Sequence, residues 1–284
     1  MIKNKILDKY LGKTLVGIDI LIRKTGVLNS ALQKEFIEHN NFKIFYGKED
    51  NSLISFILTN NDYERETREV IENIISQGDT FFDLGANIGY FSLLTARIVG
   101  DEGKIYAFEP TPSTLKFLTK NISENNFNNR VIVEKYAVSN KIGKVNFRLN
   151  KGSECNSITE NSGQGTISVN TITLDKYVKD RKIKKVDLIK MDIEGQEFSA
   201  LQGMKDVNKA NKDLKIIFEF HKENLNENGM TGLEIFLLLK DYGFNRFTVL
   251  FRKPYEILIP DDFHIIQAQA TRENLNILAE KIII

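Results

Sequence analysis

The clearest pattern in the chain is an alternation, starting near residue 80, of short apolar runs with longer segments that are apolar on one side. The short runs are predicted to be buried strands, and the one-sided segments are predicted to be helices that cover them. Because right-handed crossovers wind such units into one parallel sheet, the pattern predicts an α/β fold. The first five predicted elements alternate strand and helix at 80–84, 88–98, 104–109, 112–125 and 131–135.

The pattern continues less regularly toward the C-terminus. A polar stretch at 151–165 contains three glycines and is long enough to be a functional loop. The final segment, 271–284, is predicted to be a helical tail. Further strands are predicted at 144–149, 166–174, 186–191, 214–220, 247–251 and 264–268, and further helices at 198–204 and 233–242.

An N-terminal extension precedes the alternating part. Apolar residues within 1–40 recur at helical spacing, and 42–59 is predicted to be a hairpin that turns at 47–51. The N-terminal helix is expected to pack on the main domain or on a second subunit, which would make the protein a homo-oligomer. The predicted organisation is therefore an extension at 1–60, a main domain at 61–270 that begins with a helix, and the tail at 271–284.

Length and composition limit the class of protein. At 284 residues, with 42% hydrophobic and 27% charged residues, the chain has the composition of an ordinary globular protein. The formal net charge of +1 provides no basic field that would favour nucleic acid as a partner. No apolar run reaches the ~18 residues of a membrane-spanning helix, and no signal-peptide pattern is present. The single cysteine, Cys155, fits a reducing compartment, so a cytoplasmic location is expected.

The turn after the first strand carries the most specific chemistry. Asp83 lies at the end of an apolar run, and Gly85, Asn87 and Gly89 follow at every second position before a helix. A strand, a glycine turn and a helix N-terminus form a cradle for a nucleotide-like cofactor. A dinucleotide fingerprint has glycine in place of Asn87, and the Asp83 carboxylate would repel a pyrophosphate. The turn therefore favours S-adenosylmethionine, which carries a sulfonium and an ammonium.

A second acid lies at the end of the next strand. Glu109 follows the apolar run 104–108, twenty residues after Gly89. An acid at the tip of the second strand of a βαβ unit accepts hydrogen bonds from the hydroxyls of an adenosine ribose. Pro110 stops the strand, and Thr111 is placed to cap the next helix. The ordered pair of acids supports the prediction of an S-adenosylmethionine site.

Two motifs together make the chain similar to a known family. One motif is Asp-Leu-Gly-Ala-Asn-Ile-Gly at 83–89, followed by Phe-Glu-Pro at 108–110. The other is Lys-Met-Asp-Ile-Glu-Gly-Gln-Glu at 190–197. With this pair at this separation, the chain resembles the FkbM family of S-adenosylmethionine-dependent methyltransferases over about residues 64 to 270.

The resemblance implies a class I methyltransferase fold, which is a Rossmann-like sheet of seven strands, mostly parallel with the last strand antiparallel and with helices on both faces. It also implies methylation of a hydroxyl on a sugar, a glycan or a secondary metabolite. Seven residues are implied to lie at the cofactor: Asp83, Gly85, Asn87 and Gly89 around its methionine part, Glu109 at its ribose, Ala137 near its adenine and Glu64 beside the pocket.

Three later residues are candidates for the chemistry of the acceptor. Methyl transfer to oxygen requires the acceptor oxygen about 3 Å from the methyl group and a group that removes its proton. Asp192 and His221 each follow a predicted strand, where such groups belong. Asp192 is expected to be the base or to anchor the hydroxyl, and His221 either acts as base or caps and packs. Glu194 is a third catalytic candidate or caps a helix starting at Gly195. The sequence lacks the acid-rich run of a hard-cation site, so no metal is expected.

Other functions remain open at this point. A nucleic-acid amino-methyltransferase commonly carries two adjacent prolines, and none of the four prolines in this chain adjoins another. A second alternative is a non-catalytic binding or scaffold protein that retains the fold. The acids present at both cofactor positions, Asp83 and Glu109, argue against it. An NAD-dependent oxidoreductase is opposed by Asp83 and Asn87.

Overall fold

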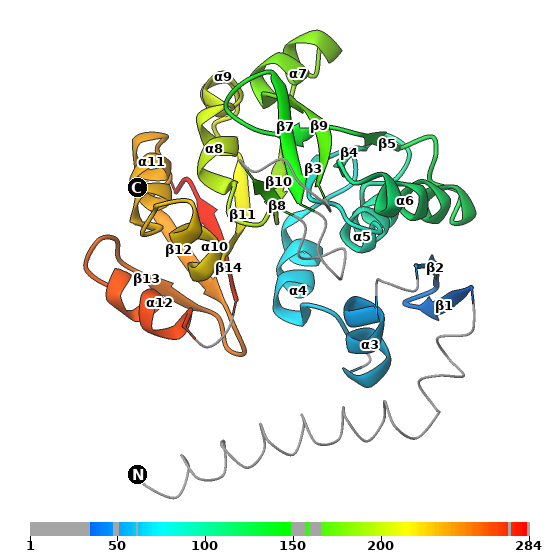
Figure 1. The fold of residues 1–284 in the computed structure, drawn as a ribbon, viewed down its shortest axis with the longest axis horizontal. Helices are drawn as coiled ribbons and strands as arrows, with labels where there is room; N and C mark the ends of the chain where they lie inside the picture. Colours follow the sequence, from blue (N-terminus) through cyan, green and yellow to red (C-terminus); the bar gives the residue numbers. More distant parts are fainter. Residues whose placement is uncertain are drawn as a thin grey trace, which may run out of the picture.

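The computed structural model describes residues 35–47, 51–60, 62–148, 157–159, 166–271 and 274–282. The predicted N-terminal helix, the subunit contact expected for it and most of the predicted loop at 151–165 lie outside these residues. Within them, the chain forms an eight-stranded sheet with helices on both faces, a smaller four-stranded sheet and a two-stranded hairpin (Figure 1).

The eight-stranded sheet has the order β13-β12-β14-β11-β10-β3-β4-β5. Neighbouring strands from β11 to β5 are parallel, whereas β14 is antiparallel to both β11 and β12. This arrangement confirms the predicted α/β, class I methyltransferase fold, and the short β13 adds an eighth strand at one edge. The strands are β3 (Thr80–Leu84), β4 (Lys104–Phe108), β5 (Val131–Glu134), β10 (Leu188–Met191), β11 (Lys215–Phe220), β12 (Arg246–Leu250), β13 (Tyr255–Ile257) and β14 (Leu275–Glu280).

The strand order reverses between β3 and β10. From β3 the chain adds β4 and then β5 on one side, and it later adds β10 and then β11 on the other. In open α/β sheets, ligands bind outside the carboxyl ends of the strands at such a reversal. The topology therefore places a crevice at the ends of β3 and β10.

Helices cover both faces of the sheet, so its strands are apolar on both sides. Phe81 and Phe82 are both fully buried but lie in different clusters, because neighbouring side chains on a strand point to opposite faces. No helix in the described ranges is long and apolar enough to cross a membrane. The helices are α3 (Asn51–Asn60), α4 (Arg65–Ile74), α5 (Tyr90–Val99), α6 (Pro112–Glu124), α7 (Leu174–Arg181), α8 (Glu197–Gln202), α9 (Lys205–Ala210), α10 (Lys222–Glu227), α11 (Leu233–Asp241) and α12 (Phe263–Gln269).

The N-terminal hairpin differs from the prediction of strands within 42–59. The hairpin pairs β1 (Phe36–His39) with β2 (Phe42–Phe45), and the apolar run predicted as its second strand forms α3 instead. A short apolar run does not distinguish a buried strand from a buried helix, and here Ile54 and Ile57 are buried at helical spacing. The extension also shares the core of the main domain, since Asn121 of α6 exchanges two hydrogen bonds with the backbone of Phe45.

The prediction of a helical tail at 271–284 is wrong. Its central part forms β14, which lies between β11 and β12. Leu275, Ile277 and Ala279 are fully buried on one face, and Leu278 joins the cluster on the other. A strand buried on both faces has a continuous apolar run and therefore lacks the alternation that identifies half-buried strands. The main sheet thus extends past the predicted boundary at residue 270.

Three further predicted strands lie outside the main sheet. The segment predicted as a strand at 264–268 lies within α12. The strands predicted at 144–149 and 166–174 form part of the smaller sheet rather than the main one. This smaller sheet has the order β6-β9-β7-β8 and consists of β6 (Ala137–Val138), β7 (Gly143–Arg148), β8 (Ser157–Thr159) and β9 (Thr166–Ile172).

Candidate active site

A cavity opens at the carboxyl ends of β3, β4, β10 and β11, where the topology predicts a crevice. Its wall is formed by the loops that follow these strands, with contributions from the start of α4 and from β6 and β7. The structure brings together nine of the ten residues that the sequence singled out: Glu64, Asp83, Gly85, Asn87, Glu109, Ala137, Asp192, Glu194 and His221 all line this cavity.

The tenth residue, Gly89, lies outside the lining and has a packing role. It is the N-cap of α5 and has φ 95°, a conformation that favours glycine. A Cβ at this position would lie 2.6 Å from Cδ1 of Leu118 on α6. Gly89 therefore allows α5 to begin close to α6 rather than forming part of the cavity wall.

Gly85 fixes the distance between the two loops at the strand reversal. Its φ is 80°, and a Cβ would lie 1.9 Å from the backbone oxygen of Asp192. The Gly85 amide donates to the Phe108 carbonyl at 3.0 Å, and the Asp192 amide donates to the Leu84 carbonyl at 3.0 Å. Only glycine fits between the loop after β3 and the loop after β10.

The Gly85→Ala substitution is therefore expected to destabilise the protein more than a substitution at an open glycine. Gly78 is the matched control, because its φ is 83° and nothing lies within 4 Å of a Cβ placed there. Both substitutions introduce about 1–2 kcal/mol of backbone strain, and Gly85→Ala adds about 1–3 kcal/mol of overpacking. Chemical denaturation of both variants measures the difference, and equal losses would contradict the close approach.

Asp83 is a buried carboxyl at the end of β3. Its Oδ2 accepts a hydrogen bond of 2.6 Å from the hydroxyl of Ser92 on α5. Burial raises the pKa of Asp83, and the positive charge of Lys190 opposes that rise. A cationic ligand in the cavity would stabilise the ionised form of this carboxyl.

Both carboxylate oxygens of Glu109 are held by backbone amides. Asn87 N–H donates to Oε2 at 3.1 Å, and Thr111 N–H donates to Oε1 at 2.8 Å. Thr111 occupies the N-cap position of α6, as the sequence predicts, but its side chain makes no capping hydrogen bond. The two amides therefore hold the Glu109 carboxylate in a fixed orientation at the cavity wall.

Lys190 places a buried ammonium among three carboxyl groups. Its Nζ donates to Asp192 Oδ2 at 2.9 Å and lies 4.0 Å from Glu64 Oε2. In the strand register Lys190 lies directly opposite Asp83, and its Nζ lies 4.6 Å from the ring centroid of Phe91. Burial alone would lower the pKa of Lys190, but the charges of Asp192, Glu64 and Asp83 raise it above its ordinary value. The side chain is therefore protonated and links these acids.

Glu64 connects the start of α4 to the last strand. It has φ 43° at the N-cap of α4, and its Oε2 accepts a hydrogen bond of 2.9 Å from Asn276 Nδ2 on β14. Burial raises the pKa of Glu64, whereas Lys190 lowers it. The corrected position of β14 thus explains how residues far apart in sequence meet at this cavity.

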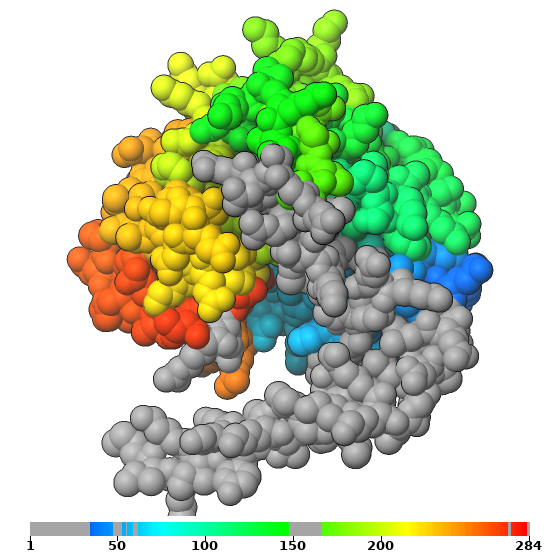
Figure 2. Space-filling view, viewed as in Figure 1, coloured from blue at the N-terminus to red at the C-terminus, as the bar shows by residue number. Residues whose placement is uncertain are grey.

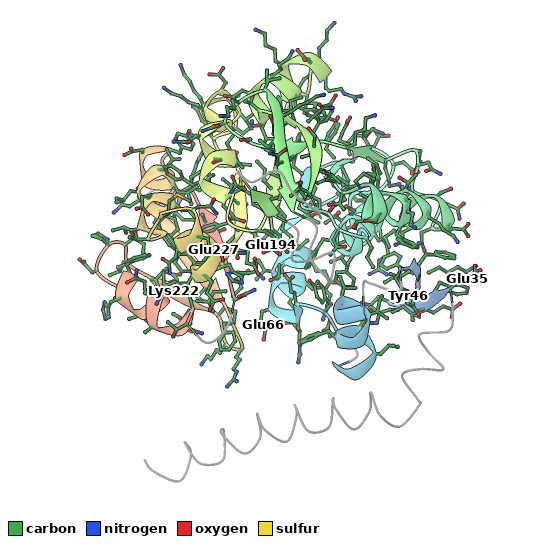
Figure 3. All side chains as sticks on the ribbon, viewed as in Figure 1. Glu35, Tyr46, Glu66, Glu194, Lys222 and Glu227 are labelled. Atoms are coloured by element: carbon green, nitrogen blue, oxygen red, sulfur yellow. The ribbon has the colours of Figure 1, made fainter. Side chains whose placement is uncertain are left out.

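Glu194 belongs to the opposite wall and does not cap a helix. It has φ 55°, and its Oε2 accepts a hydrogen bond from Asn224 Nδ2 on α10. Helix α8 begins at Glu197 with Gln196 as its N-cap, so the alternative of a helix starting at Gly195 does not apply. Glu194 is labelled in Figure 3 beside Glu227 of α10.

His221 is the N-cap of α10 and lines the cavity as well. Its Nδ1 accepts a hydrogen bond of 3.3 Å from the Asn224 amide. A neutral imidazole whose Nδ1 accepts carries its proton on Nε2. In this arrangement the ring has a hydrogen-bond donor, rather than a base, available to a ligand.

Two glutamates, the half-buried Glu219 and the buried Glu197, were missed as functional candidates by the sequence reasoning. Glu219 of β11 lines the cavity and accepts a hydrogen bond of 2.9 Å from Asn274 Nδ2. Burial and the neighbouring carboxylates, Asp192 foremost, raise the pKa of Glu219 well above its ordinary value. A charged residue inside the apolar run 214–220 was the available signal. Glu197 holds the loop after β10 by accepting from the Ile193 amide at 3.1 Å, and burial raises its pKa to about 7.

The fold and the cavity define the class of protein. An acidic cavity at the strand reversal of this sheet, with a glycine turn after β3 and an oriented acid after β4, suits a cationic nucleoside cofactor. These are the features of a class I methyltransferase that uses S-adenosylmethionine. The sequence model that defines the methyltransferase FkbM domain family matches residues 83–246 of this chain. The chain therefore belongs to this family.

The chain is also similar to individual proteins. The chain is 27% identical over 191 residues to the hexuronic acid methyltransferase AglP of Haloferax volcanii. The matched region covers 59% of this chain and 77% of that protein. The solved structure of an S-adenosylmethionine-dependent O-methyltransferase from Thermotoga maritima matches with a TM-score of 0.45 and 15% identity, covering 88% and 78% of the two chains. An S-adenosylmethionine-dependent methyltransferase from Aquifex aeolicus matches with a TM-score of 0.43 and 16% identity, covering 80% and 98%.

Proposed function

We propose that the protein is an O-methyltransferase whose acceptor is a hydroxyl of a sugar, free or within a glycan or natural product. One observation carries this proposal: the acids suited to the cofactor and the candidate groups for acceptor chemistry line a single cavity. The similarity to a hexuronic acid methyltransferase supports a sugar as acceptor.

S-adenosylmethionine, when bound, supplies a methyl group on a positively charged sulfur. We assign Glu109 to its ribose hydroxyls, because the Asn87 and Thr111 amides orient both carboxylate oxygens. Asp83 is assigned to its methionine part, where a buried carboxyl stabilises positive charge. Ala137 of β6 lines the same cavity and is assigned to the adenine side.

Asp192 is the proposed proton acceptor. Its Oδ2 is held by Lys190 at 2.9 Å, which fixes the carboxylate and directs Oδ1 to the acceptor. As the acceptor oxygen bonds to the methyl carbon, the carbon–sulfur bond breaks and the hydroxyl proton passes to Asp192. His221 is proposed to orient the acceptor by donating from Nε2, and Glu194 to accept from a neighbouring acceptor hydroxyl. The products are a methyl ether, a neutral thioether and a proton released to solvent.

Labelled methyl transfer tests this function directly. The full-length protein is incubated with methyl-labelled S-adenosylmethionine and a panel of sugars and surface-glycan extracts, and the products are located by mass spectrometry and NMR. Methyl ethers on sugar hydroxyls are expected. Donor binding without transfer to any acceptor would favour a non-catalytic role, and label found in nucleic acid would favour the rival acceptor class.

Glu109→Ala is expected to weaken donor binding while the fold persists. Removing a carboxylate that binds two ribose hydroxyls costs about 1.5–3 kcal/mol, or roughly 10- to 100-fold in affinity. Isothermal titration calorimetry with S-adenosylmethionine measures this loss, and the exposed carboxylate of Glu124 on α6 provides the control Glu124→Ala. Equal affinities of Glu109→Ala and wild type would remove Glu109 from the donor site.

A further inference from the structure

The described lining of the cavity is strongly acidic. It contains six carboxyl side chains, namely Glu64, Asp83, Glu109, Asp192, Glu194 and Glu219, whereas Lys190 is the single lysine or arginine among those described lining residues. S-adenosylmethionine has one ammonium, one sulfonium and one carboxylate, so bound donor adds a net charge of only about +1. The carboxyl groups of the described lining therefore still outnumber the positive charges of Lys190 and the bound donor.

Glu219 is neither bonded to Lys190 in the described contacts nor assigned to the donor. The Lys190 ammonium bonds Asp192 and lies near Glu64, and Asp83 and Glu109 are assigned to the donor. Glu219 accepts from the neutral amide of Asn274, and the strongest charges that act on it are those of Asp192 and three other carboxyl groups. Because these carboxyl groups and burial raise the pKa of Glu219, a cation bound beside it would favour its ionised form.

The position of Glu219 in the sheet directs it to the acceptor side of the crevice. It lies opposite Asn276 in the antiparallel register of β11 and β14, and Asn276 binds Glu64. His221 follows two residues later and lines the same cavity. The nearby cation of α10, Lys222, directs its Nζ to the carbonyl of Gln267 on α12 instead. Figure 2 shows this contact region, where the yellow surface of α10 adjoins the orange surface of the C-terminal part.

We propose, on the basis of the O-methyltransferase function above, that the acceptor is an amino sugar and that Glu219 binds its protonated amine beside the hydroxyl that is methylated. The ammonium supplies a positive charge, which the neutral side-chain amide of Asn274 does not. It also reduces the mutual repulsion of Glu219 and Asp192, which keeps the Asp192 carboxylate able to accept the hydroxyl proton. Glu219 is thus a specificity-determining residue in this proposal.

The same charges disfavour a uronic acid as acceptor. A carboxylate bound near Glu219 and Asp192 adds a like charge inside a partly desolvated cavity, where charges interact more strongly than in water. The chain is therefore expected to differ in acceptor charge from the hexuronic acid methyltransferase to which it is similar.

Four matched acceptors test the proposal with the full-length protein and labelled S-adenosylmethionine. They are the methyl glycosides of glucosamine, N-acetylglucosamine, glucose and glucuronic acid, and each of the other three differs from glucose at a single carbon, C2 for the two amino sugars and C6 for glucuronic acid. The kcat/KM for glucosamine is expected to exceed those for N-acetylglucosamine and glucose by about tenfold or more, since a charged hydrogen bond contributes about 1.5–3 kcal/mol. Glucuronic acid is expected to be the poorest acceptor.

Glu219→Gln is expected to reduce the ratio of kcat/KM between glucosamine and glucose by about tenfold, mainly through KM for the amino sugar. Glu256→Gln, at an exposed carboxylate on β13, is the control and should preserve the ratio. Calorimetry with S-adenosylmethionine verifies that the variant retains the donor site.

The failures of the two proposals are distinguishable. A preference for glucose or glucuronic acid, or an unchanged ratio in Glu219→Gln, would overturn the amino-sugar inference and leave O-methylation standing. Methyl label on the amine nitrogen, or on no sugar of the panel, would overturn both.

Discussion

Asp192→Asn is expected to lower turnover of methyl transfer by about 10²- to 10⁴-fold, the range associated with a general base. The amide keeps the size of the carboxyl and can still accept a hydrogen bond, but it cannot take the hydroxyl proton. The loss in donor affinity should be smaller than the loss in turnover. Single-turnover rates with labelled donor, together with calorimetry on the same preparation, separate the two effects.

The control for this substitution is Asp241→Asn, at an exposed position on α11. It should leave both turnover and donor affinity at the wild-type level. Wild-type turnover in Asp192→Asn would exclude Asp192 as the base. The acid after β10 would then serve to hold Lys190 rather than to accept a proton.

Lys190→Met is expected to reduce the free energy of unfolding by about 3–5 kcal/mol near neutral pH, the range for removing one partner of a buried ion pair. Methionine has a similar length, so the change mainly removes charge. The substitution leaves Asp192, Glu64 and Asp83 facing one another without the cation that they share. Urea denaturation measures the loss, and Lys209→Met at an exposed position on α9 is the control.

The pH dependence of this loss gives an independent check of its cause. The pKa of Lys190 is raised in the folded state, so its stabilising contribution is fully present below its unfolded pKa and disappears only at more alkaline pH. The carboxyls of Glu64 and Asp83 also have raised pKa values, and they become protonated as the pH falls. The difference between wild type and Lys190→Met should therefore be smaller at about pH 4 than at pH 7. A loss that is constant across this range would indicate lost packing instead of lost charge.

Local sequence was sufficient to predict which residues line the cavity at the ends of β3 and β4. The turn after β3 places Asp83, Gly85 and Asn87 within five residues, and β4 carries Glu109 to the same edge of the sheet. These positions follow from strand order and turn geometry, which are short-range features. Gly89 was the exception, because its contact with Leu118 depends on the packing of α5 against α6.

The part of the cavity wall formed by Glu64 and Glu219 depends on contacts that no local pattern contains. Glu64 reaches the cavity because Asn276 and Lys190 hold it, and Asn276 lies on a strand that was predicted to be a helix. Glu219 appears in sequence as one charge in an apolar run, and only the pairing of β11 with β14 shows that it faces the cavity wall. Strand β14 carries the apolar run 277–279 beside Asn276 and lacks the strict alternation of a half-buried strand, so its type is decided by tertiary pairing rather than by periodicity.

We propose that the acidic cavity at the reversal between β3 and β10 holds the methyl donor. A crystal structure with S-adenosylhomocysteine, the product of the donor, tests this placement most directly. We expect the ribose hydroxyls of the ligand within hydrogen-bond distance of Glu109 and its methionine part beside Asp83. A ligand bound elsewhere on the molecule, with this cavity filled only by water, would contradict it.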